Sequence, residues 1–128
     1  MPPSELKKAR AKAKDAFRKY IVKRDASEGY ARCPTCGKSV LLCDLQCGHY
    51  LAGCRGLVQF DERNAHAQCQ QDNMGGEKNE EYTAWMLGEY GQEVIDELIK
   101  LDNTEHRFSV TELLEIAKHY RDKTEELE

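Results

Sequence analysis

The feature that most constrains this chain is a pair of short motifs, Cys33-Pro34-Thr35-Cys36-Gly37 and Cys69-Gln70-Gln71-Asp72. Two cysteines with two residues between them at a tight turn can bind one metal ion, and the following glycine lets backbone amides face the sulfurs. The second motif has the same spacing but ends in aspartate, a less common yet acceptable zinc ligand. We therefore predict a structural Zn²⁺ ion bound by Cys33, Cys36, Cys69 and Asp72.

The other cysteines leave alternatives open. Cys43, Cys47 and Cys54 are not part of either motif, so one of them can replace Asp72 as the fourth ligand, although free, buried cysteine is the commoner fate. Six cysteines can also form disulfides in a secreted protein. The first residues, 1–8, lack the apolar stretch of a signal peptide, and no apolar run is long enough to span a bilayer. We therefore expect a cytoplasmic protein with metal-bound cysteines. A thioredoxin-like redox pair at Cys33 and Cys36 would need a βαβ context, which the pattern does not show.

The charge distribution is strongly uneven along the chain. The net charge is −4, yet residues 1–24 hold nine Lys or Arg against two acidic residues, so this segment carries +7 and the remainder −11. A concentrated basic helix can provide a phosphate-binding surface. We predict DNA contacts by Lys12, Lys19, Lys23 and Arg55; the alternative is an ordinary solvated helix face.

Apolar spacing predicts an α+β fold with one domain over 1–128: a basic helix (1–25), a metal-binding core (31–79) and a helical C-terminal part (80–128). Ser4 is expected to cap a helix over 4–25. Short β-prone pieces at 39–42 and 57–60 suggest turns and a hairpin. A helix from Asn79 should end at Gly91, and a further apolar stripe follows at 94–99. The sequence Ser109-Val110-Thr111-Glu112 is a capping box that should open the last helix.

Three polar residues lie between or just after the two metal motifs: His49, Asn64 and Asn73. A histidine and two asparagines at these separations within a split zinc site match the HNH, or ββα-metal, pattern. Hydrolysis of a phosphodiester needs a base for water, and neutral imidazole suits that task near pH 7. It also needs a divalent cation to stabilise charge on the phosphate and the leaving oxygen. The pattern therefore predicts a nuclease site.

The three residues are assigned different roles. His49 is the expected general base, and Asn73 can offer an amide oxygen to a catalytic Mg²⁺ or Mn²⁺ ion. Asn64 is expected to hold the hairpin and the strand that bears the histidine in register. The alternative for His49 is a core or zinc-binding histidine. His66, His106 and His119 lack this context and are expected to be surface or packing residues.

These motifs, taken together, resemble the NinG (also called Rap) recombination endonuclease family of lambdoid phages. The resemblance extends over nearly the whole chain; beyond the metal motifs it rests on the sequences Ala16-Phe17-Arg18-Lys19-Tyr20-Ile21, Gly48-His49-Tyr50 and Phe60-Asp61-Glu62-Arg63-Asn64-Ala65-His66-Ala67-Gln68-Cys69. The arrangement of half-sites around the histidine is also similar to phage endonuclease VII. The resemblance implies structure-selective cleavage of branched DNA, such as Holliday junctions and D-loops, during phage recombination. Symmetric cleavage of a junction needs two active sites, so a homodimer is expected.

Two positions depart from the family pattern. Family members usually carry Cys where Asp72 stands, and Gly48 occupies a position where many HNH enzymes have an acidic or histidine metal ligand. The catalytic ion is therefore expected to be held by Asn73, phosphate and waters, with Glu77 nearby. These departures favour the alternative function, a non-catalytic zinc-binding protein that binds DNA through a degenerate HNH site. The His49–Asn73 pair favours the nuclease.

Overall fold

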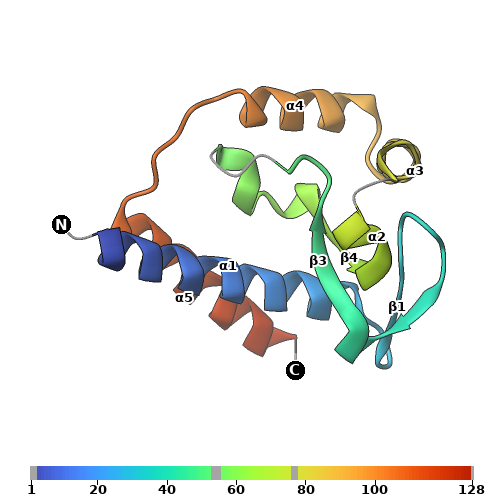
Figure 1. The fold of residues 1–128 in the computed structure, drawn as a ribbon, viewed down its shortest axis with the longest axis horizontal. Helices are drawn as coiled ribbons and strands as arrows, with labels where there is room; N and C mark the ends of the chain where they lie inside the picture. The colour runs from blue at the N-terminus through green and yellow to red at the C-terminus, as the bar shows by residue number, and fades with distance from the viewer. Residues whose placement is uncertain (1–2, 53–55, 76–77, 128) are drawn as a thin grey trace.

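The computed structural model describes residues 3–52, 56–75 and 78–127. It has the predicted α+β character: a long N-terminal helix, two small antiparallel sheets and C-terminal helices (Figure 1). No described helix combines the length and apolar character that crossing a membrane requires.

The first and last helices, α1 (Pro3–Asp25) and α5 (Val110–Glu126), lie side by side along one edge of the molecule (Figure 1). The predicted apolar stripe of α1 is buried from Ala9 to Ile21, whereas Leu6 is 39% exposed. The helix begins at Pro3, so Ser4 lies in its first turn and the predicted cap at Ser4 is wrong. Proline is favoured at the first helical position because its φ is already helical and its missing N–H has no helical partner there.

The contact between the two helices is aromatic. Phe17 packs edge-on against Tyr120 with ring centroids 4.9 Å apart, and Tyr20 lies 5.3 Å from the same ring. The predicted capping box opens α5: the Ser109 hydroxyl accepts from the Glu112 amide, and the Glu112 carboxylate accepts from the Ser109 amide. This arrangement satisfies two N–H groups that lack helical partners.

Two shorter helices, α3 (Asn79–Glu89) and α4 (Gln92–Asp102), pack around Tyr82, Met86 and Leu98. Gly91 separates them with φ +90° and donates its N–H to Leu87 O at 3.0 Å, as expected for a glycine that follows a helix. Ile99, from the predicted second stripe, stays 43% exposed.

The sheets are two separate hairpins. Strand β1 (Tyr30–Arg32) pairs with β2 (Ser39–Leu41), and β3 (Leu45–His49) pairs with β4 (Ala65–Cys69). In the second hairpin Gln46 is opposite Gln68 and His49 is opposite Ala65. The short helix α2 (Gln70–Gly75) follows β4 directly.

The segment 57–60, expected to be β-prone, is instead a 3₁₀ helix, η2 (Leu57–Phe60), so that prediction is wrong. Its conformation buries Val58 completely against Tyr82, Met86 and Leu98, a packing that a strand pairing would not provide. Two further 3₁₀ turns, η1 (Leu42–Asp44) and η3 (Glu62–Asn64), precede β3 and β4.

Candidate functional site

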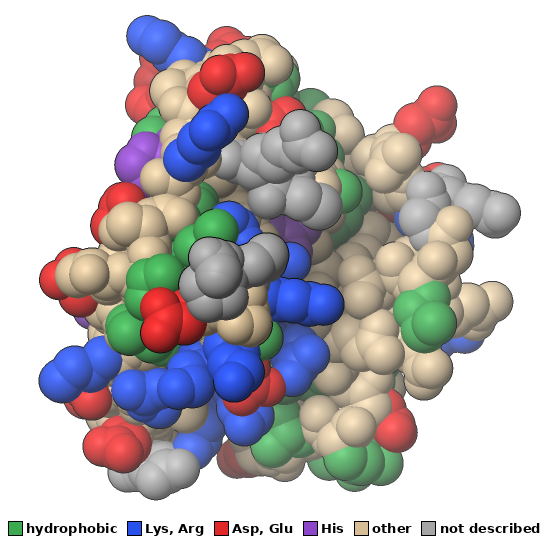
Figure 2. All heavy atoms as spheres, turned by 60° about the vertical axis from the view of Figure 1, so that its left-hand side comes forward, with side chains coloured by type: hydrophobic (Ala, Val, Ile, Leu, Met, Phe, Trp, Pro, Cys, Tyr) green, Lys and Arg blue, Asp and Glu red, His purple; other side chains and the backbone are tan. Residues whose placement is uncertain are grey.

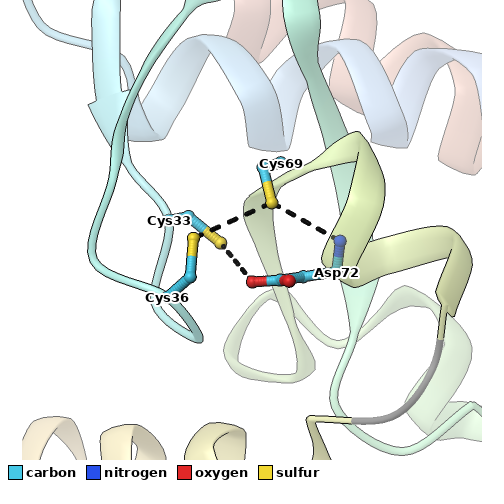
Figure 3. A group of neighbouring side chains, drawn as sticks. All are labelled: Cys33, Cys36, Cys69 and Asp72. Atoms are coloured by element: carbon cyan, nitrogen blue, oxygen red, sulfur yellow. Dashed lines mark hydrogen bonds between the residues drawn. The ribbon is translucent and has the colours of Figure 1, made fainter.

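The two metal motifs meet as predicted from their spacing (Figure 3). Cys33 and Cys36 lie on the turn between β1 and β2, Cys69 ends β4, and Asp72 lies in the first turn of α2. Their ligand atoms all lie within 4.8 Å of one another. Cys33 and Asp72 are buried, and the other two cysteines are partly exposed.

The turn at the first motif depends on Gly37. Its φ of +76° is the left-handed conformation that glycine adopts without strain. The Gly37 amide donates to Cys33 O at 2.8 Å, and the Cys33 amide donates to Lys38 O at 2.9 Å. These bonds fold the chain back on itself, so the two sulfurs point to the same side.

The cluster dimensions fit a tetrahedral zinc ion. Zn–S and Zn–O distances of about 2.3 and 2.0 Å require S···S and S···O separations of about 3.8 and 3.5 Å. Cys36 Sγ lies 3.8 Å from Cys69 Sγ, and Cys33 Sγ lies 3.5 Å from Asp72 Oδ2. The Thr35 hydroxyl donates to Asp72 Oδ2 at 2.6 Å and lowers the pKa of this carboxyl, which favours the charged form that binds metal.

The other cysteines do not join this cluster. Cys43 is exposed, and Cys47 is packed near Phe17 and Tyr20, away from the four ligand atoms. Cys54, like Arg55 and Glu77, lies outside the described residues. Among the described residues, Asp72 is therefore the group that completes the set of four.

A cleft of about 550 Å³ lies beside the cluster, between α1, β3 and the start of α3. It brings together residues from the basic helix, the histidine strand and the second metal motif. Its lining includes Lys14, Phe17, Arg18, His49, Gln59, Gln68, Asp72, Asn73 and Lys78.

His49 is at the end of β3 and lines this cleft. Its Nε2 is 2.9 Å from the Gln59 carbonyl oxygen, and a carbonyl can only accept, so Nε2 carries the proton. The lone pair of the neutral ring is then on Nδ1. Burial lowers the pKa of His49, the Gln59 carbonyl opposes this shift, and the Lys14 cation adds to it. At neutral pH the ring is uncharged and able to accept a proton.

Asn64 is fully buried outside the cleft. Its amide oxygen accepts from the Leu51 amide at 2.8 Å, and its Nδ2 donates to the carbonyl oxygens of Leu51 and Val58. The Asn64 carbonyl also accepts from the Tyr50 amide at 2.7 Å. Asn64 thus ties the chain after His49 to the segment that carries the Gln59 carbonyl. Its role in holding the strand that bears the histidine stays a prediction.

Asn73 lies on α2 and lines the cleft. Its Nδ2 donates to Gln46 Oε1 at 2.8 Å. This bond fixes the amide orientation, so Oδ1 is the atom that remains to bind another group.

The DNA-binding residues predicted on α1 do not line the cleft. Lys12 is exposed, Lys19 is exposed and 3.0 Å from Asp15, and Lys23 is half-buried. Instead Lys14 and Arg18, one helical turn apart, line the cleft. Figure 2, which brings the N-terminal end of α1 towards the reader, shows Lys and Arg side chains gathered in a band beside a hollow.

Among the cleft residues that were not predicted from the sequence as site residues are Lys14, Arg18, Gln59 and Gln68. For the two cations the sequence offers their four-residue spacing, which places them on one face of the predicted basic helix, beside Phe17. In the structure the ring of Phe17 lies 5.9 Å from that of His49. The two glutamines carry no sequence signal, since their placement depends on the folding of η2 and the register of β4.

The remaining histidines lie outside the cleft lining. His66 is buried between Tyr82 and Tyr90, which lie 3.1 and 2.9 Å from its ring nitrogens, so it is a packing residue. His106 pairs with Glu112, and His119 is exposed.

Comparison with known proteins places the chain in a family. The family model described as "Bacteriophage Lambda NinG protein" matches residues 4–128. The chain is 31% identical over 117 residues to "Protein ninG" of Escherichia phage 933W and to that of Enterobacteria phage VT2-Sa, and 29% identical to that of Escherichia phage lambda. Each match covers 90% of this chain but 55–56% of the relative, so the chain spans about half the length of these proteins. No solved structure matches it. The chain belongs to the bacteriophage lambda NinG protein family.

Proposed function

We propose that this chain is a metal-dependent DNA endonuclease of the HNH type that cleaves branched DNA during phage recombination. The observation that carries the proposal is the state of His49: a neutral imidazole in a cleft, with Nε2–H held by the Gln59 carbonyl and Nδ1 left as the proton acceptor. A base held in this way can remove a proton from a water molecule that attacks a phosphodiester.

The surroundings of His49 suit an anionic substrate. Lys14, Arg18 and Lys78 line the same cleft and can neutralise phosphate oxygens. A bound Mg²⁺ or Mn²⁺ ion would stabilise negative charge on the phosphate and the leaving oxygen. Asn73 supports such an ion through Oδ1, since hard divalent cations prefer oxygen ligands.

Zinc has a separate, structural part in this proposal. Cys33, Cys36, Cys69 and Asp72 form a closed set of four ligands, which is typical of structural rather than catalytic zinc. The ion would join the turn after β1 to the start of α2, the helix that carries Asn73. Zinc would thereby keep one side of the cleft in place without taking part in hydrolysis.

The preference for branched DNA rests on the resemblance to recombination nucleases. Junction cleavage requires two active sites, and we propose that a homodimer provides them. The second candidate function is a non-catalytic protein that binds zinc and DNA; Gly48 favours it, because this position directly before His49 has no side chain that could bind Mg²⁺.

One experiment separates the two functions. The purified, zinc-loaded chain is incubated with a synthetic four-way junction and Mg²⁺ or Mn²⁺, and strand cleavage is followed for wild type, His49→Ala and the control His119→Ala. We expect His49→Ala to lose about 10²–10⁴-fold in cleavage rate, the usual contribution of a general base. Junction binding and zinc content should be unchanged, and His119→Ala should cleave as wild type does.

Two results would contradict the nuclease. Junction binding without cleavage by wild type at any divalent metal concentration would favour the non-catalytic protein. Equal cleavage by wild type and His49→Ala would remove His49 from the chemistry.

A further inference from the structure

Two cleft residues carry amide groups whose orientation is fixed by the hydrogen bond that each nitrogen donates. Asn73 donates through Nδ2 to Gln46. Gln68 donates through Nε2 to Thr35 Oγ1 at 3.2 Å, and Thr35 in turn donates to Asp72. Because both nitrogens are engaged, both amide oxygens are left as acceptors, and neither accepts a hydrogen bond from a described residue.

The position of Gln68 Oε1 is unusual. The residue is only 5% exposed, and its oxygen lies beside the backbone of Gly48, in the place that a methyl group on Gly48 would occupy. Gln68 therefore occupies the space that a side chain at position 48 would fill, directly before His49. Among the described residues, the buried side-chain oxygen without a hydrogen-bond partner is Gln59 Oε1, so Gln68 Oε1 is not sealed in the core. Gln68 lines the cleft, and its oxygen is open to water or to a ligand.

Gln68 and Asn73 are close to each other in the fold. Gln68 is opposite Gln46 in the β3–β4 register, and Gln46 is the residue that accepts from Asn73. Both residues line the cleft that contains His49. A glutamine from β4 and an asparagine from α2 thus border the same cleft.

We propose that Gln68 Oε1 and Asn73 Oδ1 together bind the divalent cation of the cleft, which makes Gln68 a metal ligand. This assignment adds a metal ligand to the proposed nuclease site. It rests on the proposed function only for the part that the ion takes in hydrolysis. Two neutral oxygens bind Mg²⁺ weakly, so water and substrate phosphate complete its coordination. Lys14, Arg18 and Lys78 line the same cleft, which further disfavours binding before the phosphate enters.

The hydrogen bonds also connect this site to the zinc cluster. Gln68 donates to Thr35, Thr35 donates to Asp72, and Asp72 is a member of the cluster. The cluster thereby holds the Gln68 nitrogen on Thr35 and leaves its oxygen beside Gly48.

A local test uses paramagnetic broadening of NMR signals by Mn²⁺, which detects weak sites. Zinc-loaded protein is titrated with substoichiometric Mn²⁺, and we expect the side-chain amide signals of Gln68 and Asn73 and the backbone signal of Gly48 to broaden first. Gln68→Met keeps the size of the side chain and removes the oxygen. In this variant the Asn73 signals should no longer broaden before those of other residues. The control is Gln70→Met, the same substitution at an exposed position of α2.

Gly48→Ala provides an independent variant that removes no polar group. Its new methyl group must displace Gln68 Oε1 together with Cδ and crowds Cγ, so the whole end of this flexible side chain has to move. Gly48→Ala should therefore weaken Mn²⁺ broadening at Asn73 as Gln68→Met does. Adding Gly48→Ala to Gln68→Ala should cause no further loss, since the oxygen is already gone.

The activity assay gives the second readout. The Mg²⁺ concentration that half-saturates junction cleavage should rise roughly tenfold or more in Gln68→Met and Gly48→Ala, the scale seen when groups around a metal site are removed, and should stay unchanged in Gln70→Met. Sharp Gln68 and Asn73 signals while Mn²⁺ broadens other regions would overturn the cation site. If the signals broaden as expected but wild type does not cleave DNA, the site stands and the nuclease proposal fails.

Discussion

The helical pair α1–α5 and the cysteine region, made of the β1–β2 turn, the end of β4 and α2, are stabilised in different ways. The helical pair buries large aromatic and aliphatic side chains such as Phe17, Ile21 and Tyr120. The core nearest the cysteine region is small and consists of Ala31, Leu45 and Ala67, while Leu41 and Leu42 remain exposed. Apolar burial can stabilise the first region alone, but the second needs metal ligation and hydrogen bonds. The cleft lies where the two regions meet, so it depends on both.

Removal of zinc should have the largest effect, and this effect should be confined to the cysteine region. Structural zinc contributes about 10–16 kcal/mol of apparent binding free energy in zinc-finger peptides. Chelation, or Cys33→Ser, should therefore unfold the β1–β2 turn and α2 while α1 and α5 remain paired. Amide hydrogen exchange, resolved by region and combined with zinc analysis, measures this difference. Exchange that rises equally in both regions would show that they unfold together.

Truncation of a side chain in the α1–α5 core should instead destabilise the helical pair and leave the zinc site intact. Phe17 is 2% exposed and contacts His49, Phe60 and Tyr120, so Phe17→Ala should lower the free energy of unfolding by about 3–5 kcal/mol. Urea denaturation measures this decrease, and zinc content should remain at one ion per chain. Leu6→Ala, at a 39% exposed position of the same helix, is the control and should cost far less.

Acid should lower the free energy of unfolding through His66, which lies on β4 of the β3–β4 hairpin. Burial lowers the pKa of His66 to about 4, whereas an unfolded chain has a histidine pKa of about 6.5. Above pH 6.5 the ring is neutral in both states and contributes no pH dependence. As pH falls from 6.5 to 4, only the unfolded chain gains the proton, so the free energy of unfolding should fall by about 3 kcal/mol.

The measurement is urea denaturation at several pH values, for wild type and for His66→Phe. The variant lacks the titrating ring, so its free energy of unfolding should fall by about 3 kcal/mol less than that of wild type between pH 6.5 and 4. Identical pH dependence in the two proteins would mean that His66 is solvated or charged in the folded protein.

The smallest expected effect is on DNA affinity, measured after neutralising different sets of cations on α1. Neutralising Lys14 and Arg18 to Gln should weaken junction binding and reduce the log–log salt slope by about 0.9 for each phosphate that the protein no longer neutralises. The triple change of Lys12, Lys19 and Lys23 tests the set predicted from the sequence; we expect a flatter slope there too if the whole helix face binds phosphate.

The control for both sets is neutralisation of Lys100 and Lys118, exposed cations on α4 and α5 outside the cleft. If this control lowers affinity as much as the changes in α1, binding reflects net charge alone. If the changes in α1 have no effect, the basic helix face is only solvated surface.

The amino-acid sequence by itself determined the features that depend on local spacing. Apolar residues at three- and four-residue steps predicted α1 and α5, the Ser109–Glu112 box predicted where α5 begins, and matched motif spacing predicted the cluster of Cys33, Cys36, Cys69 and Asp72. These features follow from helix periodicity and ligand reach, which act over a few residues.

Only the tertiary structure decided the composition of the cleft. Segment 57–60 forms a 3₁₀ helix because Val58 is buried against α3 and α4, and this turn carries the carbonyl that orients His49. The placement of Gln68 over Gly48 depends on strand register, since a shift by one residue would turn its side chain to the other face. Such long-range packing has no local signature, so it becomes visible only when the distant segments are placed together.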